Sequence, residues 1–389
     1  MERLNVAVLL GGESVESDIS IITGVQVFNA LDENKYNKIL IYIDKNGKWW
    51  KCEGGVKNAK DVLNCKKCEI VLKSGDNNLF LIKGRKLKLA MPLHCAVLAL
   101  HGGFGENGAV QGFLKMCKIP FTSSESISSG LTMDKCITKL ILKGGAIPTL
   151  PYVSLKKIDY YENEEKNIEK IIKKLNFPLI IKPACLGSSI GINVAHNEEE
   201  LYNSINFAFK FDNKLLIETA LTDFYELNIS ARIVNGKIAL SQIEKPQKTD
   251  EILSFCDKYQ SNIAVKGGNG CKATKFGADA NCNEGSKGMA NLKRECPANI
   301  DKDMEQELKL LAKRIYKLFD CLGIVRLDFL VRSDGKLFLN EINSIPGSLS
   351  FYLWGKERFG NIIDEEINNA IKRKLLDDDL IKNFDSSIF

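Results

Sequence analysis

Residues 324–347 read IVRLDFLVRSDGKLFLNEINSIPG and carry the clearest structural signal in the chain. Two runs rich in β-branched and aromatic residues, 324–331 and 336–343, flank Ser333-Asp334-Gly335. Asp-Gly between two apolar runs is the strongest short-range signal for a β-hairpin. The stretch therefore predicts two antiparallel strands joined by a two-residue turn at Asp334-Gly335.

The two faces of this hairpin differ in chemistry. A two-residue turn sets Asp328 directly opposite Glu341, and period-two alternation adds Arg326 and Asn343 to the same face. The opposite face is predicted to enter a core, and it carries Leu327, Phe329, Val331, Phe338 and Ile342.

Two carboxylates that face each other across a strand pair repel, which a purely structural hairpin avoids. A hard divalent cation removes that cost, and Mg²⁺ is held by carboxylates and other oxygen ligands together with substrate phosphates. We interpret Asp328, Glu341 and Asn343 as Mg²⁺ ligands, with Arg326 placed to neutralise developing negative charge. An exposed hairpin with solvated charges is the alternative.

A second candidate lies where a predicted strand, 178–182, runs into Pro183 and the small-residue loop 185–191. Small residues let backbone amides approach an anion closely. Lys182, at the strand end, can offer a point charge to a phosphate. An ordinary turn is the alternative.

The amino-terminal part alternates strands and helices, which predicts a parallel sheet and an α/β fold. A strand at 5–10 leads through Gly11-Gly12 to a helix at 17–31, where Glu16 is placed to meet an ammonium group or to be a solvated helix-start carboxylate. A later strand at 96–100 runs into His101 and a glycine-rich loop. We expect either a functional or a structural role for His101.

Composition and charge exclude several classes of function. The 389 residues suffice for two or three subdomains, and a net charge of +5 without a basic cluster argues against nucleic-acid binding. The first apolar run is too short for a signal peptide or a membrane span, so we expect a cytoplasmic protein. The 12 cysteines are expected to be free thiols, with a zinc site at Cys65 and Cys68 as the alternative.

Six stretches, in this order, resemble the D-alanine–D-alanine ligase family of ATP-grasp enzymes. They are VAVLLGGESVESDIS, LHGGFGENGAVQGFL, IPFTSSESISSGLTMDKCITK, FPLIIKPACLGSSIGI, LLIETALTDFYELNISAR and the hairpin stretch already quoted. The resemblance implies an α/β (α+β) fold with an N-terminal α/β domain (1–122), a central ATP-grasp subdomain (123–220), a C-terminal ATP-grasp subdomain (221–376) and a tail (377–389).

The resemblance also implies an ATP site and a set of roles. ATP would bind between the central and C-terminal subdomains, with two Mg²⁺ ions, or Mn²⁺, on the hairpin ligands. It places Lys135, Lys182 and Lys258 at the nucleotide, Glu218 in the adenine hinge and Glu226 at the ribose. Glu16, Ser188 and Tyr259 would meet the first D-alanine, and Arg326 would stabilise a tetrahedral intermediate. Lys258 and Tyr259 fall in the long polar segment 245–298, which we interpret as a lid.

The implied activity is ligation of two D-alanines through an acyl phosphate, for peptidoglycan precursor synthesis by a homodimer. Residues 348–354, SLSFYLW, depart from the family pattern after Pro-Gly, where the acceptor is bound. D-serine or D-lactate therefore remains open as the acceptor. Another carboxylate–amine pair and an inactive ATP-binding regulator are further alternatives.

Overall fold

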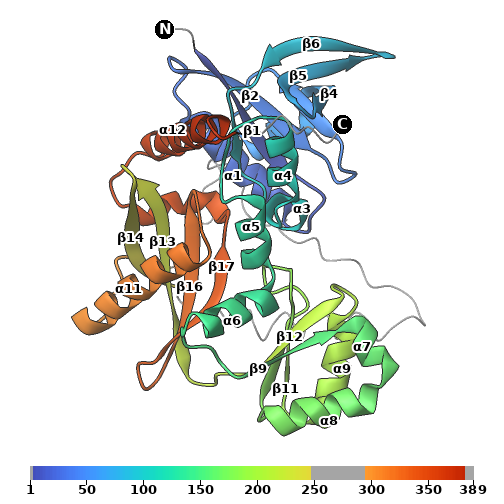
Figure 1. The fold of residues 1–389 in the computed structure, drawn as a ribbon, viewed down its shortest axis with the longest axis vertical. Coiled ribbons are helices and arrows are strands. Elements are labelled where there is room, and N and C mark those ends of the chain that lie inside the picture. Colours follow the sequence, from blue (N-terminus) through green and yellow to red (C-terminus); the bar gives the residue numbers. More distant parts are fainter. Residues whose placement is uncertain (1–2, 247–293, 382–389) are drawn as a thin grey trace, which may run out of the picture.

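The chain folds around three β-sheets, as the computed structural model shows for residues 3–246 and 294–381 (Figure 1). The first sheet has the strand order β6-β5-β4-β3-β2-β1-β7-β8. Its strands are β1 (Leu4–Gly11), β2 (Tyr36–Ile43), β3 (Trp49–Glu53), β4 (Lys66–Lys73), β5 (Asp76–Lys83), β6 (Lys86–Pro92), β7 (Cys95–Leu98) and β8 (Phe121–Thr122). Strands β2, β1, β7 and β8 pair in parallel, which confirms the predicted parallel sheet.

The parallel part of this sheet forms from continuous apolar runs, because strands covered on both faces need apolar side chains throughout. Residues Val6 to Leu10 of β1 are fully buried. The accompanying helices are α1 (Ser17–Ala30), α2 (Ala59–Asn64), α3 (Gly103–Glu106) and α4 (Ala109–Met116). Residues 49–92 extend the sheet as the antiparallel strands β3 to β6.

The second sheet has the order β11-β10-β12-β9 and forms the lower, green part of Figure 1. Its elements are β9 (Tyr152–Lys156), α7 (Lys157–Glu162), α8 (Glu164–Lys174), β10 (Leu179–Pro183), β11 (Asn193–Ala195), α9 (Glu198–Ala208) and β12 (Lys214–Thr219). Residues 161–175 do not form one continuous helix. Asn163 separates two helices, because its side chain accepts the Lys166 N–H and caps the start of α8.

Two helices, α5 (Ser126–Met133) and α6 (Lys135–Gly144), connect the first sheet to the second. Helix α6 begins at Asp134, whose carboxylate accepts the N–H groups of Cys136 and Ile137. The cap fixes Lys135 as the first residue of α6, and the Lys135 N–H donates to the Ala184 carbonyl. The start of this helix is thereby attached to the end of β10.

The third sheet has the order β15-β14-β13-β16-β17. Its elements are β13 (Phe224–Val234), β14 (Lys237–Pro246), β15 (Arg294–Glu295), α11 (Lys302–Leu318), β16 (Val325–Arg332) and β17 (Leu337–Asn343). The 3-10 segment η2 (Gly347–Leu353) and helix α12 (Phe359–Asp378) follow. Helix α12 returns to the first sheet, where Ile362, Ile363 and Ile367 join the core beneath β1 and β7.

The predicted hairpin is present as β16 and β17, and Asp328 does lie opposite Glu341. The two-residue turn is wrong, because Arg332 pairs with Lys336 around a three-residue loop that ends at Gly335 (φ +82°). A β-bulge at Asn340 restores the register, since Leu339 faces Phe329 while Glu341 faces Asp328.

The bulge also changes which side chains enter the core. Leu337 and Leu339 join the core beneath the sheet, together with Ile342. Phe338 instead lies opposite Leu330, on the face of Asp328, so the prediction that Phe338 enters this core is wrong. An apolar pair thus continues the ionic face toward the hairpin turn.

Two further findings bear on the excluded classes. Across residues 3–246 and 294–381, no helix is both long and apolar enough to cross a membrane. The Cys68 thiol donates to the Glu53 carboxylate at 3.3 Å. Within those two ranges, no group of three or more His, Cys, Asp or Glu side chains is arranged to hold a metal ion.

Candidate active site

The ionic face of the β16–β17 hairpin brings together the four residues that the sequence placed there. The Arg326 guanidinium donates two hydrogen bonds to the Asp328 carboxylate, each 2.7 Å long. The Asn343 amide donates to the same carboxylate at 3.0 Å. Asp328 is buried and Glu341 is partly exposed. The predicted spacing therefore yields a compact cluster and not a row of separately solvated charges.

Burial and nearby cations act on these carboxylates in opposite directions. Burial raises the pKa of Asp328, although Arg326 opposes this shift. Burial also disfavours the charged form of Glu341, but the ammonium of Lys135 and the guanidinium of Arg326 hold its pKa below the ordinary value. Lys135 Nζ lies 3.7 Å from Glu341 Oε2. The Glu341 carboxylate is therefore ionised at neutral pH and can bind a cation.

The donor set fits magnesium or manganese. Asp328 and Glu341 offer carboxylate oxygens, and Asn343 offers an amide oxygen from the same face. Two carboxylates and an amide are too few for a complete octahedral shell, and Mg²⁺ sites of this kind are completed by water and substrate phosphates. The residues would hold the metal next to Lys135 and Lys182, where a phosphate would be attracted.

A group of three lysines lies beside the ionic face of the hairpin. Lys182 Nζ donates to Glu218 Oε2 at 3.1 Å, and Lys139 Nζ lies 2.7 Å from Glu218 Oε1. The side chains of Lys139 and Glu218 are each 1% exposed. Lys135 Nζ donates to the Leu186 carbonyl at 2.6 Å. Helix α6 and strand β10 thus bring three ammonium groups to one place, beside Glu218 on strand β12.

Glu218 stays ionised although it is completely buried. Burial by itself raises its pKa, but the ammonium groups of Lys182 and Lys139 more than reverse this and lower the pKa to about 2. Burial lowers the pKa of Lys139, and Glu218 opposes that shift. The group is therefore an ion network in which each charge depends on the others.

Glu16 and Ser188 meet across the gap between the first sheet and the loop after β10. Ser188 Oγ donates a hydrogen bond to Glu16 Oε1. Burial raises the pKa of Glu16, which the Ser188 contact opposes. Gly102 has φ +67°, a backbone conformation that favours glycine, and a Cβ there would come within 2.8 Å of Glu16 Oε2.

His101 is buried between helix α1 and the chain after β17. Its Nδ1 lies 2.8 Å from the Ile345 carbonyl and its Nε2 lies 2.8 Å from Thr23 Oγ1. A carbonyl can only accept, so Nδ1 carries the proton and Nε2 accepts from the Thr23 hydroxyl. Thr23 Oγ1 in turn accepts the Ser348 N–H at 3.0 Å. Burial lowers the pKa of His101 to about 4, so the ring is neutral.

Of the remaining predicted site residues, Glu226 lies within the described part of the chain, and Lys258 and Tyr259 do not. Glu226 is on β13, and its pKa is raised by burial and by the charges of Asp328 and Glu341, so it lies near the ionic face of the hairpin. Lys258, Tyr259 and most of the predicted lid lie outside the described residues.

Comparison with known proteins decides the family. The model for the D-ala D-ala ligase N-terminus matches residues 5–124, and the model for the D-ala D-ala ligase C-terminus matches 141–273 and 280–360. The chain belongs to the D-alanine–D-alanine ligase family. The D-alanine–D-alanine ligase of Thermosipho africanus is 34% identical over 393 residues, covering 99% of this chain and 98% of the relative.

Solved structures agree with the family assignment. The D-Ala-D-Ala ligase of Helicobacter pylori superposes with a TM-score of 0.70 at 26% identity, covering 94% of this chain and 98% of that chain. The VanG D-Ala:D-Ser ligase of Enterococcus faecalis has a TM-score of 0.75 at 23% identity, covering 94% and 99%. This second likeness establishes only the fold. The predicted family and ATP-grasp fold are confirmed, and the family is one of ATP-dependent ligases.

Two residues of this ligase-family site were missed by the sequence reasoning. Lys139 had a usable signal, because it lies four residues after Lys135 and therefore on the same face of helix α6. Asn340 had none, since its position depends on a bulge that the Asp-Gly turn signal does not reveal. Its side-chain oxygen accepts a hydrogen bond from Lys182 Nζ at 3.1 Å.

Proposed function

We propose that this protein joins two D-alanines into D-alanyl-D-alanine for peptidoglycan precursor synthesis, using ATP and two Mg²⁺ or Mn²⁺ ions. The observation that carries the proposal is the hairpin face itself. Asp328, Glu341, Asn343 and Arg326 lie together on it, next to Lys135 and Lys182 from the central sheet. An inactive regulator derived from this family would have no need to keep both the carboxylates and the lysines.

The proposed chemistry has two steps that use this arrangement. A carboxylate oxygen of the first D-alanine forms a bond to the γ-phosphorus of ATP, and ADP leaves. The amine of the second D-alanine then attacks the acyl carbon, phosphate leaves, and the amine loses a proton. ATP supplies the phosphoryl group that activates the carboxylate. Arg326, Lys135 and Lys182 lower the cost of the negative charge that gathers in both steps.

The substrate-facing roles follow the geometry of the first sheet and its neighbours. Glu16 and Ser188 are proposed to bind the ammonium of the first D-alanine, since they already meet at the entrance to the metal face. Lys258 and Tyr259 keep their proposed roles at the nucleotide and the first D-alanine. Glu226 is proposed to bind the ribose, because it lies on the neighbouring strand of the same sheet.

For His101 we propose a positioning role. Its ring is neutral, and both nitrogens are occupied by Thr23 and the Ile345 carbonyl. The Thr23 hydroxyl then holds the Ser348 N–H at the start of η2. His101 thus connects helix α1 to the chain that follows the metal strand, and acts on the reaction through that chain.

A second acceptor remains a candidate because of the backbone after Pro346-Gly347. Ser348, Leu349 and Ser350 all adopt left-handed conformations, with φ of 53°, 47° and 49°. Such conformations cost on the order of 1 kcal/mol each for residues other than glycine, and they persist where surrounding contacts impose them. Ser350 is fully buried, and its hydroxyl has no hydrogen-bond partner. This turn is the proposed element by which D-serine or D-lactate would replace the second D-alanine.

The decisive experiment measures ADP and phosphate release by the purified protein with ATP and Mg²⁺. D-alanine is added alone, then with D-serine or D-lactate, with L-alanine as the control. Release with D-alanine alone, together with a dipeptide product, supports the proposed activity. Release only with a mixed pair assigns the second acceptor. No release with any of these substrates contradicts the proposal.

Three broader expectations belong to the same proposal. We propose a cytoplasmic location, where ATP is available, which cell fractionation tests. We propose the division into residues 1–122, 123–220 and 221–376 followed by a tail, which the three separate sheets support and limited proteolysis tests.

We also propose a homodimer. Exposed apolar side chains on the neighbouring helices α3, α4 and α5 support it, namely Phe104, Phe113, Met116 and Ile127. Light scattering on a size-exclusion column tests the dimer.

A further inference from the structure

The bulge in β17 places three consecutive residues against three ammonium groups. Lys139 Nζ donates to the Leu339 carbonyl at 3.2 Å, and Lys182 Nζ donates to Asn340 Oδ1 at 3.1 Å. Lys135 Nζ lies 3.7 Å from Glu341 Oε2. In a regular strand, side chains 339 and 341 would share one face and side chain 340 would point to the other. The extra residue changes this alternation, so that both Asn340 and Glu341 can serve the site.

The charges in this group do not balance. Glu218 is a single carboxylate in contact with two ammonium groups, those of Lys139 and Lys182. It is ionised, because its pKa is lowered to about 2 by those ammonium groups against the effect of burial. The three side chains together carry one positive charge in excess when both lysines are protonated. An excess positive charge in a buried place attracts an anion.

Asn340 is the neutral member of this contact. Its amide oxygen satisfies one hydrogen of the Lys182 ammonium without cancelling any charge. An aspartate at this position would neutralise Lys182, and an apolar residue would leave Lys182 with Glu218 alone. With no acceptor at position 340, the ammonium could move toward the ionised Glu341 carboxylate, which is the next residue along the strand.

We propose that Asn340 is a positioning residue that holds the Lys182 ammonium for the phosphates of the nucleotide while leaving its charge intact. The proposal rests on the proposed function, because it assumes that ATP and ADP bind at this face. It goes beyond that function by assigning a role to a residue outside the metal ligands and the lysines. The ligand chemistry is that of a nucleoside diphosphate or triphosphate.

The test compares two variants of Asn340 in the full-length protein. Asn340→Leu removes the acceptor, and Asn340→Asp keeps the shape and the acceptor but adds a negative charge. Binding of ADP in the presence of Mg²⁺, and of adenosine as a probe without phosphates, is measured by calorimetry. Each variant is expected to bind ADP about tenfold more weakly, which is the effect of losing one charge-assisted contact. Adenosine binding is expected to change by no more than about twofold.

Steady-state kinetics supply a second reading. The KM for ATP is expected to rise about tenfold in both variants, while the KM for the amino-acid substrate stays constant, because only the phosphate contact is altered. A merely structural role would lower the melting temperature and would change ADP binding, adenosine binding and all kinetic constants together. The matched control is Arg332→Gln on the same hairpin, whose side chain pairs with the exposed Asp334. It is expected to bind ADP like the parent protein.

The outcomes separate this proposal from the proposed function. If the parent protein binds neither ADP nor ATP, the proposed function fails and the role of Asn340 fails with it. If the parent binds ADP and both Asn340 variants bind ADP as tightly as the parent does, only the role of Asn340 is overturned. Should Asn340→Leu fail to fold, the isosteric Asn340→Asp decides. Unchanged ADP affinity in that variant overturns the proposal, and a tenfold loss with unchanged adenosine binding supports it.

Discussion

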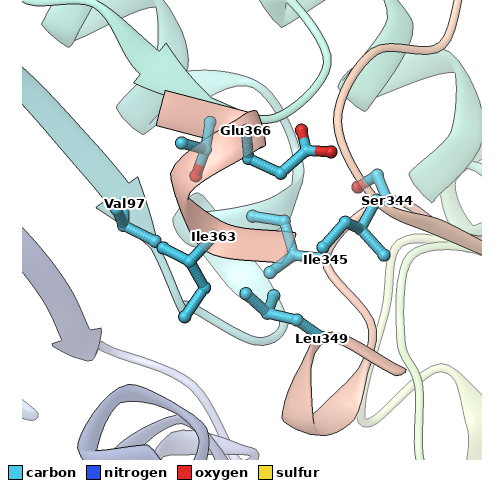
Figure 2. Close-up of a pocket in the computed structure, with 8 residues that line it drawn as sticks. Val97, Ser344, Ile345, Leu349, Ile363 and Glu366 are labelled. Carbon is cyan, nitrogen blue, oxygen red and sulfur yellow. The ribbon is translucent and has the colours of Figure 1, made fainter. Parts of the chain in front are cut away.

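Two buried glutamates, Glu218 and Glu366, show opposite responses to burial. Glu218 is in direct contact with two ammonium groups, and its pKa is lowered to about 2. Glu366, on helix α12, lines a cavity of about 10 Å³ between the first sheet and the chain after β17 (Figure 2). Burial raises the pKa of Glu366 to about 7, although the more remote charges of Arg232 and Arg373 oppose the shift.

This difference shows that burial alone does not determine whether a carboxylate is charged at neutral pH. Both side chains are almost completely removed from water, so both lose hydration of the charged form. Direct ammonium contacts reverse this effect at Glu218. For these two buried carboxylates, direct contact with ammonium groups therefore decides whether the charged form is favoured.

The largest expected effect comes from removing a charge at the site. Glu341→Gln retains the shape of the side chain but removes the carboxylate that faces Asp328 and Lys135. Turnover is expected to fall by a factor on the order of a thousand or more, because charge stabilisation at the phosphoryl group carries most of such catalysis. Phosphate release with ATP, Mg²⁺ and D-alanine measures the loss. The circular dichroism spectrum is expected to stay unchanged, and undiminished turnover would exclude the metal assignment.

The next effect is on stability, and it concerns Glu218. Glu218→Gln leaves Lys139, which is 1% exposed, without its carboxylate. Breaking a buried ion pair by removing one partner costs about 3 kcal/mol or more, because an uncompensated charge remains buried. Urea unfolding at pH 7 measures the loss. The matched double variant Glu218→Gln with Lys139→Met is expected to recover part of it, and no recovery would contradict the ion-pair explanation.

The lowered pKa of Glu218 also predicts that the stability of the parent protein depends on pH. The pKa of Glu218 in the folded state, about 2, lies below its ordinary value of 4.5. The stabilising contribution is therefore complete above about pH 4.5 and is lost as the pH falls toward 2. Urea unfolding of Glu218→Gln at a series of pH values is expected to show a smaller loss of stability through that window. Identical slopes for the two proteins would contradict the prediction.

Part of this site could be predicted from the sequence, and part could not. The Asp-Gly turn and period-two alternation predicted that Asp328 faces Glu341, and this is confirmed. The contact of Asn340 with Lys182 could not be predicted, because it depends on a β-bulge. The three-residue loop and this bulge offset each other's effect on the register, so the pairing of Asp328 with Glu341 does not reveal them. The raised pKa of Glu366 was not foreseen either, since in sequence it is one of several charged residues on a helix. Such properties depend on packing between segments that are distant in the chain.

A smaller effect of opposite sign is expected at Glu366. Between its ordinary pKa of 4.5 and about 7, the folded protein holds a proton that the unfolded chain has released. The parent protein therefore loses stability as the pH rises through this window, and the loss is complete above about pH 7. Glu366→Gln cannot ionise, so it is expected to be more stable than the parent by about 3 kcal/mol at pH 8.

Urea unfolding at two pH values measures this gain. Near pH 4.5 the parent carboxyl is protonated in the folded state, so the two proteins are expected to differ by less than about 0.5 kcal/mol there. The low-pH measurement thus serves as the control for any packing change caused by the amide. An equal gain at both pH values would attribute the stabilisation to packing and not to the buried charge.

The smallest expected effect tests the remaining type of carboxylate, one that has a cation but is exposed. Arg332 donates two hydrogen bonds to Asp334 at the hairpin turn, and the side chains are 41% and 54% exposed. The pKa of Asp334 is lowered, chiefly by the Arg332 contact, to about 2. Solvent screens such a pair, so Arg332→Ala is expected to leave the stability measured by urea unfolding almost unchanged. If Arg332→Ala destabilised the protein as much as Glu218→Gln does, contact with a cation alone would explain the difference in pKa between Glu218 and Glu366. Burial of the contact would then play no part.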